Sequence, residues 1–119
     1  MAKSYENLKI WNEAIGFATR LYVTTKGFPR EELFGLTSQI RRAAVSISAN
    51  IAEGSGRSSK KEFSRFIDIS IGSLNEVESL GRIAREVGYL STTSYNQLYD
   101  DAEKLGKSLG GFRKFLRKA

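Results

Sequence analysis

The sequence of 119 residues contains no cysteine, no histidine and a single proline, Pro29. Without cysteine the chain forms neither disulfides nor thiolate metal sites. Without histidine it lacks the commonest metal ligand and the commonest general base at neutral pH. We therefore expect no bound metal, no cofactor and no enzymatic activity.

Long hydrophobic segments are also missing. No apolar run approaches the ~20 residues that a membrane-spanning helix requires. The first residues, MAKSYENLKIW, do not form the hydrophobic core of a signal peptide. We expect a cytoplasmic protein without a membrane partner. A chain of this length predicts one domain over residues 1–119, and it is long enough to bury a single core.

Acidic residues are absent from the last part of the chain. The net charge is +6, and the first 103 residues hold 13 cations and 13 anions, so the whole excess lies after them. A local basic patch attracts nucleic acid through counterion release. Cations also stabilise the negative end of a helix dipole and keep a surface solvated. Both interpretations stay open for six residues: Lys104, Lys107, Arg113, Lys114, Arg117 and Lys118.

Four segments show the apolar periodicity of helices, at residues 8–25, 37–53, 60–87 and 92–115. No segment shows the alternation of a strand. The first segment repeats at steps of three and four and ends at Gly27–Pro29. Short connections between amphipathic helices predict an all-α, antiparallel, up-down-up-down four-helix bundle. The apolar stripe expected to face the core in the first helix is Leu8, Trp11, Ile15, Ala18, Tyr22 and Thr25.

The second helix carries two stripes. Its apolar stripe comprises Leu36, Ile40, Ala44, Ile47 and Ile51, and Gly54 and Gly56 are expected to end it. Small residues between the polar positions favour close packing on both faces. The polar stripe fits a network that sets helix register or subunit contacts, a ligand or nucleic-acid site, or a solvated face. Its members are Gln39, Arg42, Asn50 and Glu53, with Arg57 beyond them.

The third helix begins at a capping box formed by Ser59 and Glu62. Its core stripe runs from Phe63 through Ile67 and Leu74 to Ala84. Further apolar residues make it wider than one neighbouring helix needs. Gly72–Ser73 lowers helix propensity, by about 1 kcal/mol for the glycine, and suggests a close backbone contact or a bend. The additional apolar residues are Phe66, Ile69, Leu80, Ile83 and Val87.

A second basic cluster lies at the start of this helix, where cations oppose the helix dipole. It comprises Arg57, Lys60, Lys61 and Arg65, and Glu62 and Asp68 dilute its field. Phosphate binding and a solvated face are both compatible with it. Farther along the helix, Glu78 is expected to pair with Arg82, four residues on. The loop GSGRSSK lacks the spacing of a phosphate-binding P-loop, so we interpret it as a helix cap.

The chain resembles the four-helix bundle proteins called 23S rRNA intervening-sequence proteins over residues 8–115. The most specific block is Gly35–Gly54, GLTSQIRRAAVSISANIAEG. Many relatives have proline where this chain has Ser48, and a proline at this position would kink the second helix. Ser48 therefore leaves the extent of that kink open but does not affect the expected fold. The remaining matches are Leu8–Trp11 with Ala14, Phe28–Pro29 with Glu32, Arg57, Lys61–Phe63, Phe66, Gly72–Leu74, Glu76, Glu78 and Gly88–Leu90.

This resemblance implies a left-handed four-helix protomer and a ring-shaped homopentamer with a central channel. A related branch, the accessory variability determinant of diversity-generating retroelements, binds nucleic acid and a reverse transcriptase through its basic surface. The resemblance names no reaction. The leading hypothesis is therefore a non-enzymatic scaffold whose partner is a further copy of itself.

A second hypothesis is RNA or DNA binding through Lys104–Lys118, assisted by Lys60 and Lys61. A ring would multiply a weak patch and gain avidity. A different protein partner also stays open. A helix-turn-helix across residues 38–66 is a weaker interpretation, because the third helix is too long and too apolar to lie in a DNA groove.

Overall fold

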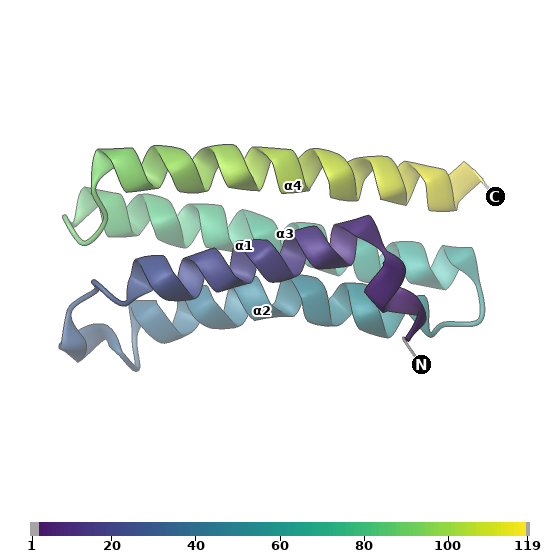
Figure 1. Cartoon of the computed structure of the whole chain (residues 1–119), viewed down its shortest axis with the longest axis horizontal. Helices are drawn as coiled ribbons and strands as arrows, with labels where there is room; N and C mark the ends of the chain where they lie inside the picture. Colours follow the sequence, from purple (N-terminus) through teal and green to yellow (C-terminus); the bar gives the residue numbers. More distant parts are fainter. Residues whose placement is uncertain (1–2, 119) are drawn as a thin grey trace.

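The computed structural model describes residues 3–118 and consists of four α-helices and two short 3-10 turns, with no strand in that range. Three connections are short, and Figure 1 shows the helices running alternately up and down along the long axis. This confirms the predicted all-α bundle. The elements are η1 (Ser4–Asn7), α1 (Lys9–Thr25), η2 (Arg30–Glu32), α2 (Leu36–Ser55), α3 (Lys60–Glu86) and α4 (Thr92–Lys118).

The bundle is elongated, with principal extents of 45 × 26 × 20 Å. One end carries both described chain ends and the α2–α3 connection (Figure 1). The other end carries the α1–α2 and α3–α4 connections. We call these the basic end and the apolar end, for the side chains that gather at each.

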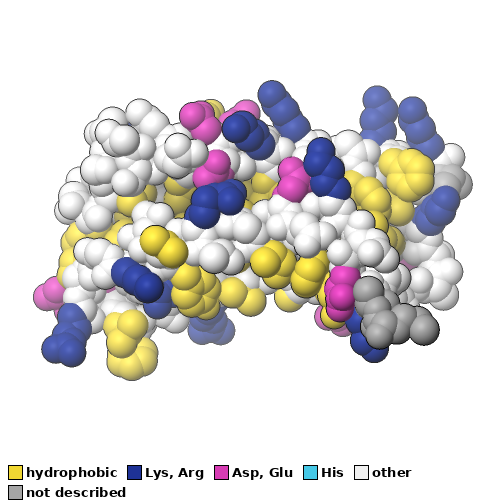
Figure 2. Space-filling view, viewed as in Figure 1, with side chains coloured by type: hydrophobic (Ala, Val, Ile, Leu, Met, Phe, Trp, Pro, Cys, Tyr) yellow, Lys and Arg dark blue, Asp and Glu magenta, His cyan; other side chains and the backbone are white. Residues whose placement is uncertain are grey.

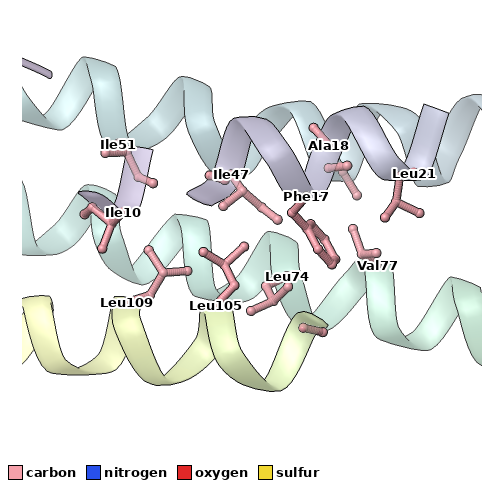
Figure 3. Close-up of a cluster of buried hydrophobic side chains, with 14 of the residues drawn as sticks. Ile10, Phe17, Ala18, Leu21, Ile47, Ile51, Leu74, Val77, Leu105 and Leu109 are labelled. Atoms are coloured by element: carbon pink, nitrogen blue, oxygen red, sulfur yellow. The ribbon is translucent and has the colours of Figure 1, made fainter. Parts of the chain in front are cut away.

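The core is a continuous layer of aliphatic side chains with one aromatic ring, Phe17, at its centre (Figure 3). Ile47 and Ile51 of α2 and Leu105 and Leu109 of α4 face it from opposite sides. Burying each large apolar side chain stabilises the fold by roughly 1.5–3 kcal/mol. The predicted apolar stripes of the second and third helices lie in this layer, apart from Leu36 and Phe63, which are partly buried against it. Ala84 is buried in a second, smaller cluster with Phe28 and Leu90.

The predicted core face of the first helix is partly wrong. Ile15 and Tyr22 are exposed, and Leu8 and Trp11 are only half-buried. The helix has a second stripe at steps of four, three and four, and this stripe faces the core. Both stripes satisfy helical periodicity, so only the position of the neighbouring helices distinguishes them. The buried residues of α1 are Ile10, Ala14, Phe17, Ala18, Leu21 and Thr25.

Several helix ends also differ from expectation. Gly54 does not end α2 but lies inside it, buried against α3, where a Cβ would lie 2.6 Å from Cβ of Phe66. The fourth helix does not end at residue 115 but continues to Lys118. The predicted caps are confirmed: Ser59 Oγ accepts from the N–H of Glu62 at 3.1 Å. After α3, Gly88 adopts φ +86° and reverses the chain.

No helix within residues 3–118 is long and apolar enough to cross a membrane.

Candidate interaction surfaces

The polar stripe of α2 divides into two parts. Ser46 Oγ lies 2.9 Å from Ser73 Oγ of α3, and Asn50 Nδ2 donates to Ser46 Oγ at 3.0 Å. Beside them, Ser70 Oγ donates to the carbonyl of Ile47 across the same seam at 2.8 Å. Small side chains therefore let α2 and α3 approach closely, as the sequence predicts. This part of the stripe is a structural network between two helices.

The outer part of the stripe is not engaged in that network. Gln39 and Arg42 line an open hollow of about 360 Å³ between α2 and α3, with Glu76 on its far wall. Within residues 3–118 no ion pair joins Arg42 to an acid. Glu53 is paired instead with Arg57, Oε1 to Nη2, at 2.9 Å. The structure thus brings Arg42 and Glu76 to one hollow and assigns Glu53 and Arg57 to a local pair.

The outer face of α3 carries the additional apolar residues that the sequence singles out. Ile69 and Ile83 are each 49% exposed and Val87 is 56% exposed, whereas Leu80 is buried in the protomer. Gly72 lies on this exposed side, and a Cβ built there would meet nothing within 4 Å. The protomer therefore contains no close contact at Gly72 itself, where the sequence predicts a close backbone contact or a bend. Its cost in helix propensity has no compensation inside this chain.

The basic tail separates into two groups of side chains on α4. Lys104, Lys107, Lys114 and Lys118 follow each other at steps of three, seven and four, and all four are exposed. Leu105 and Leu109 of the same helix are buried. The lysines thus form one stripe directed away from the core. Figure 2 shows lysine or arginine side chains standing out from the C-terminal half of α4.

The two arginines of the tail point toward α3. Arg113 Nη1 lies 3.0 Å from Asp68 Oδ1, and Arg117 Nη2 lies 2.8 Å from Asp68 Oδ2. One carboxylate therefore holds both guanidinium groups, which lie one helical turn apart. This contact attaches the last turns of α4 to α3. The two arginines are therefore held in ion pairs with α3, whereas the lysine stripe points into solvent.

The second basic cluster lies at the same end of the bundle. Lys60 Nζ lies 5.3 Å from the ring centroid of Phe115 on α4, and Arg57 lies 4.6 Å from the ring centroid of Phe66. Lys61 and Arg65 are exposed. The fold therefore brings the two basic segments that the sequence separates by about forty residues to one end. Asp68 and Glu53 form ion pairs with three of the cations there.

Two acidic side chains on α3 also depart from expectation. Arg82 pairs with Glu86 at 3.3 Å and not with Glu78. Partial burial raises the pKa of Glu78, and the negative charge of Glu103 on α4 raises it further. Between residues 3 and 118 no group of three acids could hold a metal ion.

The seam between α1 and α4 is the loosest part of the bundle. An open hollow of about 380 Å³ lies there, lined by Leu8, Ile10 and Phe112. Glu13 borders it, and Ser108 Oγ donates to Glu13 Oε2 at 3.2 Å. Glu13 Oε1 is buried without a hydrogen-bond partner among the described residues. Lys9 and Lys107 also line this hollow.

Comparison with known proteins identifies the family of this four-helix chain. A profile of the 23S rRNA-intervening sequence protein family matches residues 6–111. The chain belongs to the 23S rRNA-intervening sequence protein family. No curated protein sequence matches the chain significantly.

The fold of this family member also has a solved relative. A crystal structure from Bacteroides thetaiotaomicron VPI-5482, described as a protein with unknown function from the S23 ribosomal protein family, superposes with a TM-score of 0.81. The two chains are 25% identical, and the match covers 88% of this chain and 98% of that one. The resemblance that the motifs of α2 carry is thereby confirmed.

Sequence reasoning singled out Ile83 and Val87 but missed the other exposed hydrophobic residues at the apolar end. Large hydrophobic side chains are exposed there on three elements, and Figure 2 shows hydrophobic side chains protruding where α1 joins α2. Phe34 lies in the connection after Pro29, among charged residues. Helical periodicity does not apply to a connection, so it gave no reason to single out this residue. The exposed residues at this end are Tyr22, Val23, Leu33, Phe34, Ile83, Val87 and Tyr99.

Proposed function

We propose that this protein is a non-enzymatic scaffold that assembles with copies of itself, in the five-membered ring that the family resemblance implies. One observation carries the proposal. The outer face of α3 exposes Ile69, Ile83 and Val87 and contains a helical glycine, Gly72, with free space beside it. A small residue lets a second backbone approach closely, and exposed aliphatic side chains supply the area to bury.

The test is the mass of the purified protein in solution. Sedimentation equilibrium from about 1 to 100 µM should give a multiple of the chain mass, five for the ring. A single protomer at every concentration would contradict the proposal.

A second candidate function, nucleic-acid binding, rests on a separate observation. The basic end of the bundle carries the exposed Lys60 and Lys61 and three lysines of the α4 stripe, Lys107, Lys114 and Lys118. Protomers related by rotation about an axis along the bundle would present these ends on one rim. Neutralising several phosphates makes binding fall steeply with salt.

Fluorescence anisotropy with structured RNA, single-stranded RNA and duplex DNA, measured from 50 to 300 mM salt, tests this function. Binding that is absent at low salt would exclude it. Binding that does not weaken as salt is added would exclude the electrostatic mechanism.

A further inference from the structure

Phe34 is 94% exposed, more than any other large hydrophobic residue of the described chain. Its neighbour Leu33 is 48% exposed. Single exposed aliphatic residues are normal on a protein surface. A phenyl ring left almost entirely in water is different, because aromatic side chains dominate interface energetics when they are buried.

The segment that carries Phe34 is fixed by its neighbours. Glu32 Oε1 accepts from the backbone N–H of Leu36 at 3.0 Å and so caps α2. Its other oxygen, Oε2, accepts from the hydroxyl of Tyr89 at 3.0 Å. Gly35 leaves room for this carboxylate, because a Cβ there would lie 2.6 Å from Oε1. The ring is therefore displayed by an ordered turn, and little conformational entropy would be lost on binding.

The same end of the molecule also offers a surface that could receive the ring. Ile83 and Val87 are about half exposed on the last two turns of α3. Arg82 and Glu86 pair beside them, and Arg30 and Glu31 flank the turn that carries Phe34. Beside Ile83 and Val87 the two arginines Arg82 and Arg85 outnumber Glu86, whereas beside Phe34 the two acids Glu31 and Glu32 outnumber Arg30. The end is thus complementary in charge to a second copy of itself.

We propose that a second copy of this chain buries Phe34 against Ile83 and Val87 of its α3. This inference rests on the proposed self-assembly and names the residue that anchors it. Rotation about an axis along the bundle keeps each residue at its height. A ring therefore brings the apolar end of one protomer beside the apolar end of the next. The contact is head-to-tail, since the ring of one copy meets the helix of the other.

Sedimentation velocity of the full chain compares wild type with Phe34→Ser and with a matched control, Phe115→Ser. Phe115 is 57% exposed but lies at the basic end. The change at Phe34 should raise the dissociation constant of the assembly at least ~30-fold. The control should leave it within about threefold. Circular dichroism should show the same helix content in all three proteins, because neither ring lies in the core.

Three results are decisive. An assembled wild type with an unchanged Phe34→Ser variant would overturn the anchor and leave the scaffold standing. A monomeric wild type at about 100 µM would overturn the scaffold itself. An assembled wild type that dissociates on Phe34→Ser alone supports both.

Cross-linking locates the surface that receives Phe34, since the chain contains no cysteine of its own. Leu33→Cys and Val87→Cys chains, both of which retain Phe34, are co-expressed and oxidised, and the disulfide-linked pairs are identified by mass. We expect pairs of one Leu33→Cys chain with one Val87→Cys chain. A yield no greater than that of Phe115→Cys with Val87→Cys would overturn the proposed contact, even if Phe34→Ser dissociates the assembly.

Discussion

The two ends of this bundle differ in the chemistry of their exposed side chains. At the apolar end, charges of both signs surround Phe34, Ile83 and Val87. At the basic end, lysines outnumber acids, and the exposed aromatic residue Phe115 has Lys60 beside it. The apolar end offers area to bury, and the basic end offers a field that acts at a distance. The surface proposed for assembly and the surface proposed for polyanion binding therefore lie toward opposite ends of a bundle 45 Å long.

The largest expected effect comes from placing a charge on the apolar end. Ile83→Asp leaves the protomer folded, because the side chain is half exposed, but it puts a carboxylate into the proposed interface. We expect assembly to weaken at least about 100-fold, since an unpaired buried charge is costly. Sedimentation equilibrium measures this. Asn96→Asp, at an exposed position of α4, is the control, and equal weakening by both changes would mean a general charge effect.

The next effect separates the lysines from the arginines at the basic end. Lys107, Lys114 and Lys118 changed together to glutamine should lower nucleic-acid affinity about 30-fold at 100 mM salt and reduce the salt slope by about 2.7. Arg113 and Arg117 changed to glutamine should lower affinity less, because Asp68 already holds both side chains. Anisotropy titrations of the two variants check the order. Equal losses would show that Asp68 does not restrain the arginines.

The substitution Gly72→Ala adds one methyl group and is expected to have opposite effects on folding and on assembly. In the Phe34→Ser background, Gly72→Ala should raise the free energy of unfolding by up to about 1 kcal/mol, because the space is free and alanine favours helix. In the otherwise wild-type chain it should weaken assembly about tenfold, through a steric contact with the neighbouring helix. Urea unfolding and sedimentation measure the two effects. An unchanged assembly would remove Gly72 from the interface.

Asp68 lowers the positive electrostatic potential of the basic end. Asp68→Asn removes one negative charge and releases two arginines, so nucleic-acid affinity should rise about fivefold. Stability should fall by at most about 1 kcal/mol, because these ion pairs are partly exposed. Asp100→Asn, exposed on α4 nearer the apolar end, makes the same change in net charge. A similar gain in that control would show that net charge alone sets the affinity.

The smallest effect concerns the turn that carries Phe34. The hydrogen bond to Glu32 raises the pKa of Tyr89 above its ordinary value of about 10, and partial desolvation adds to the shift. A raised pKa in the folded state contributes stability below the unfolded pKa, and this is lost as pH rises through the folded value. Tyr89→Phe should therefore lower the melting temperature slightly at pH 7.5. The difference from wild type should disappear at strongly alkaline pH, as differential scanning fluorimetry would show.

Much of the fold follows from periodicity and caps. The expected ranges of the first three helices agree with the structure to within two residues at either end, and the Ser59 cap marks the start of α3. The face of α1 was not predictable in the same way, since two stripes compete and the core selects Phe17 over Ile15. Gly54 was misjudged for a related reason. The sequence alone does not distinguish a glycine that ends a helix from a glycine that makes room for an aromatic ring of a neighbouring helix.

The candidate sites divide similarly. The grouping of cations at the C-terminus was visible in the sequence, and the steps between Lys104, Lys107, Lys114 and Lys118 already place them on one stripe. Their separation from Arg113 and Arg117 required Asp68, which lies 45 residues from Arg113 in the chain. Phe34 was not recognised at all, because exposure in a connection has no periodic signal.

By itself, the sequence determined the helices, their order and the excess of positive charge, because propensity, capping and charge are local properties. It also excluded histidine and cysteine chemistry by composition. Only the tertiary structure decided which stripe of α1 is buried, which cations are held by Asp68, and that Phe34 and Val87 lie at one end. These properties depend on contacts between distant segments, and such contacts exist only when all four helices pack around one core.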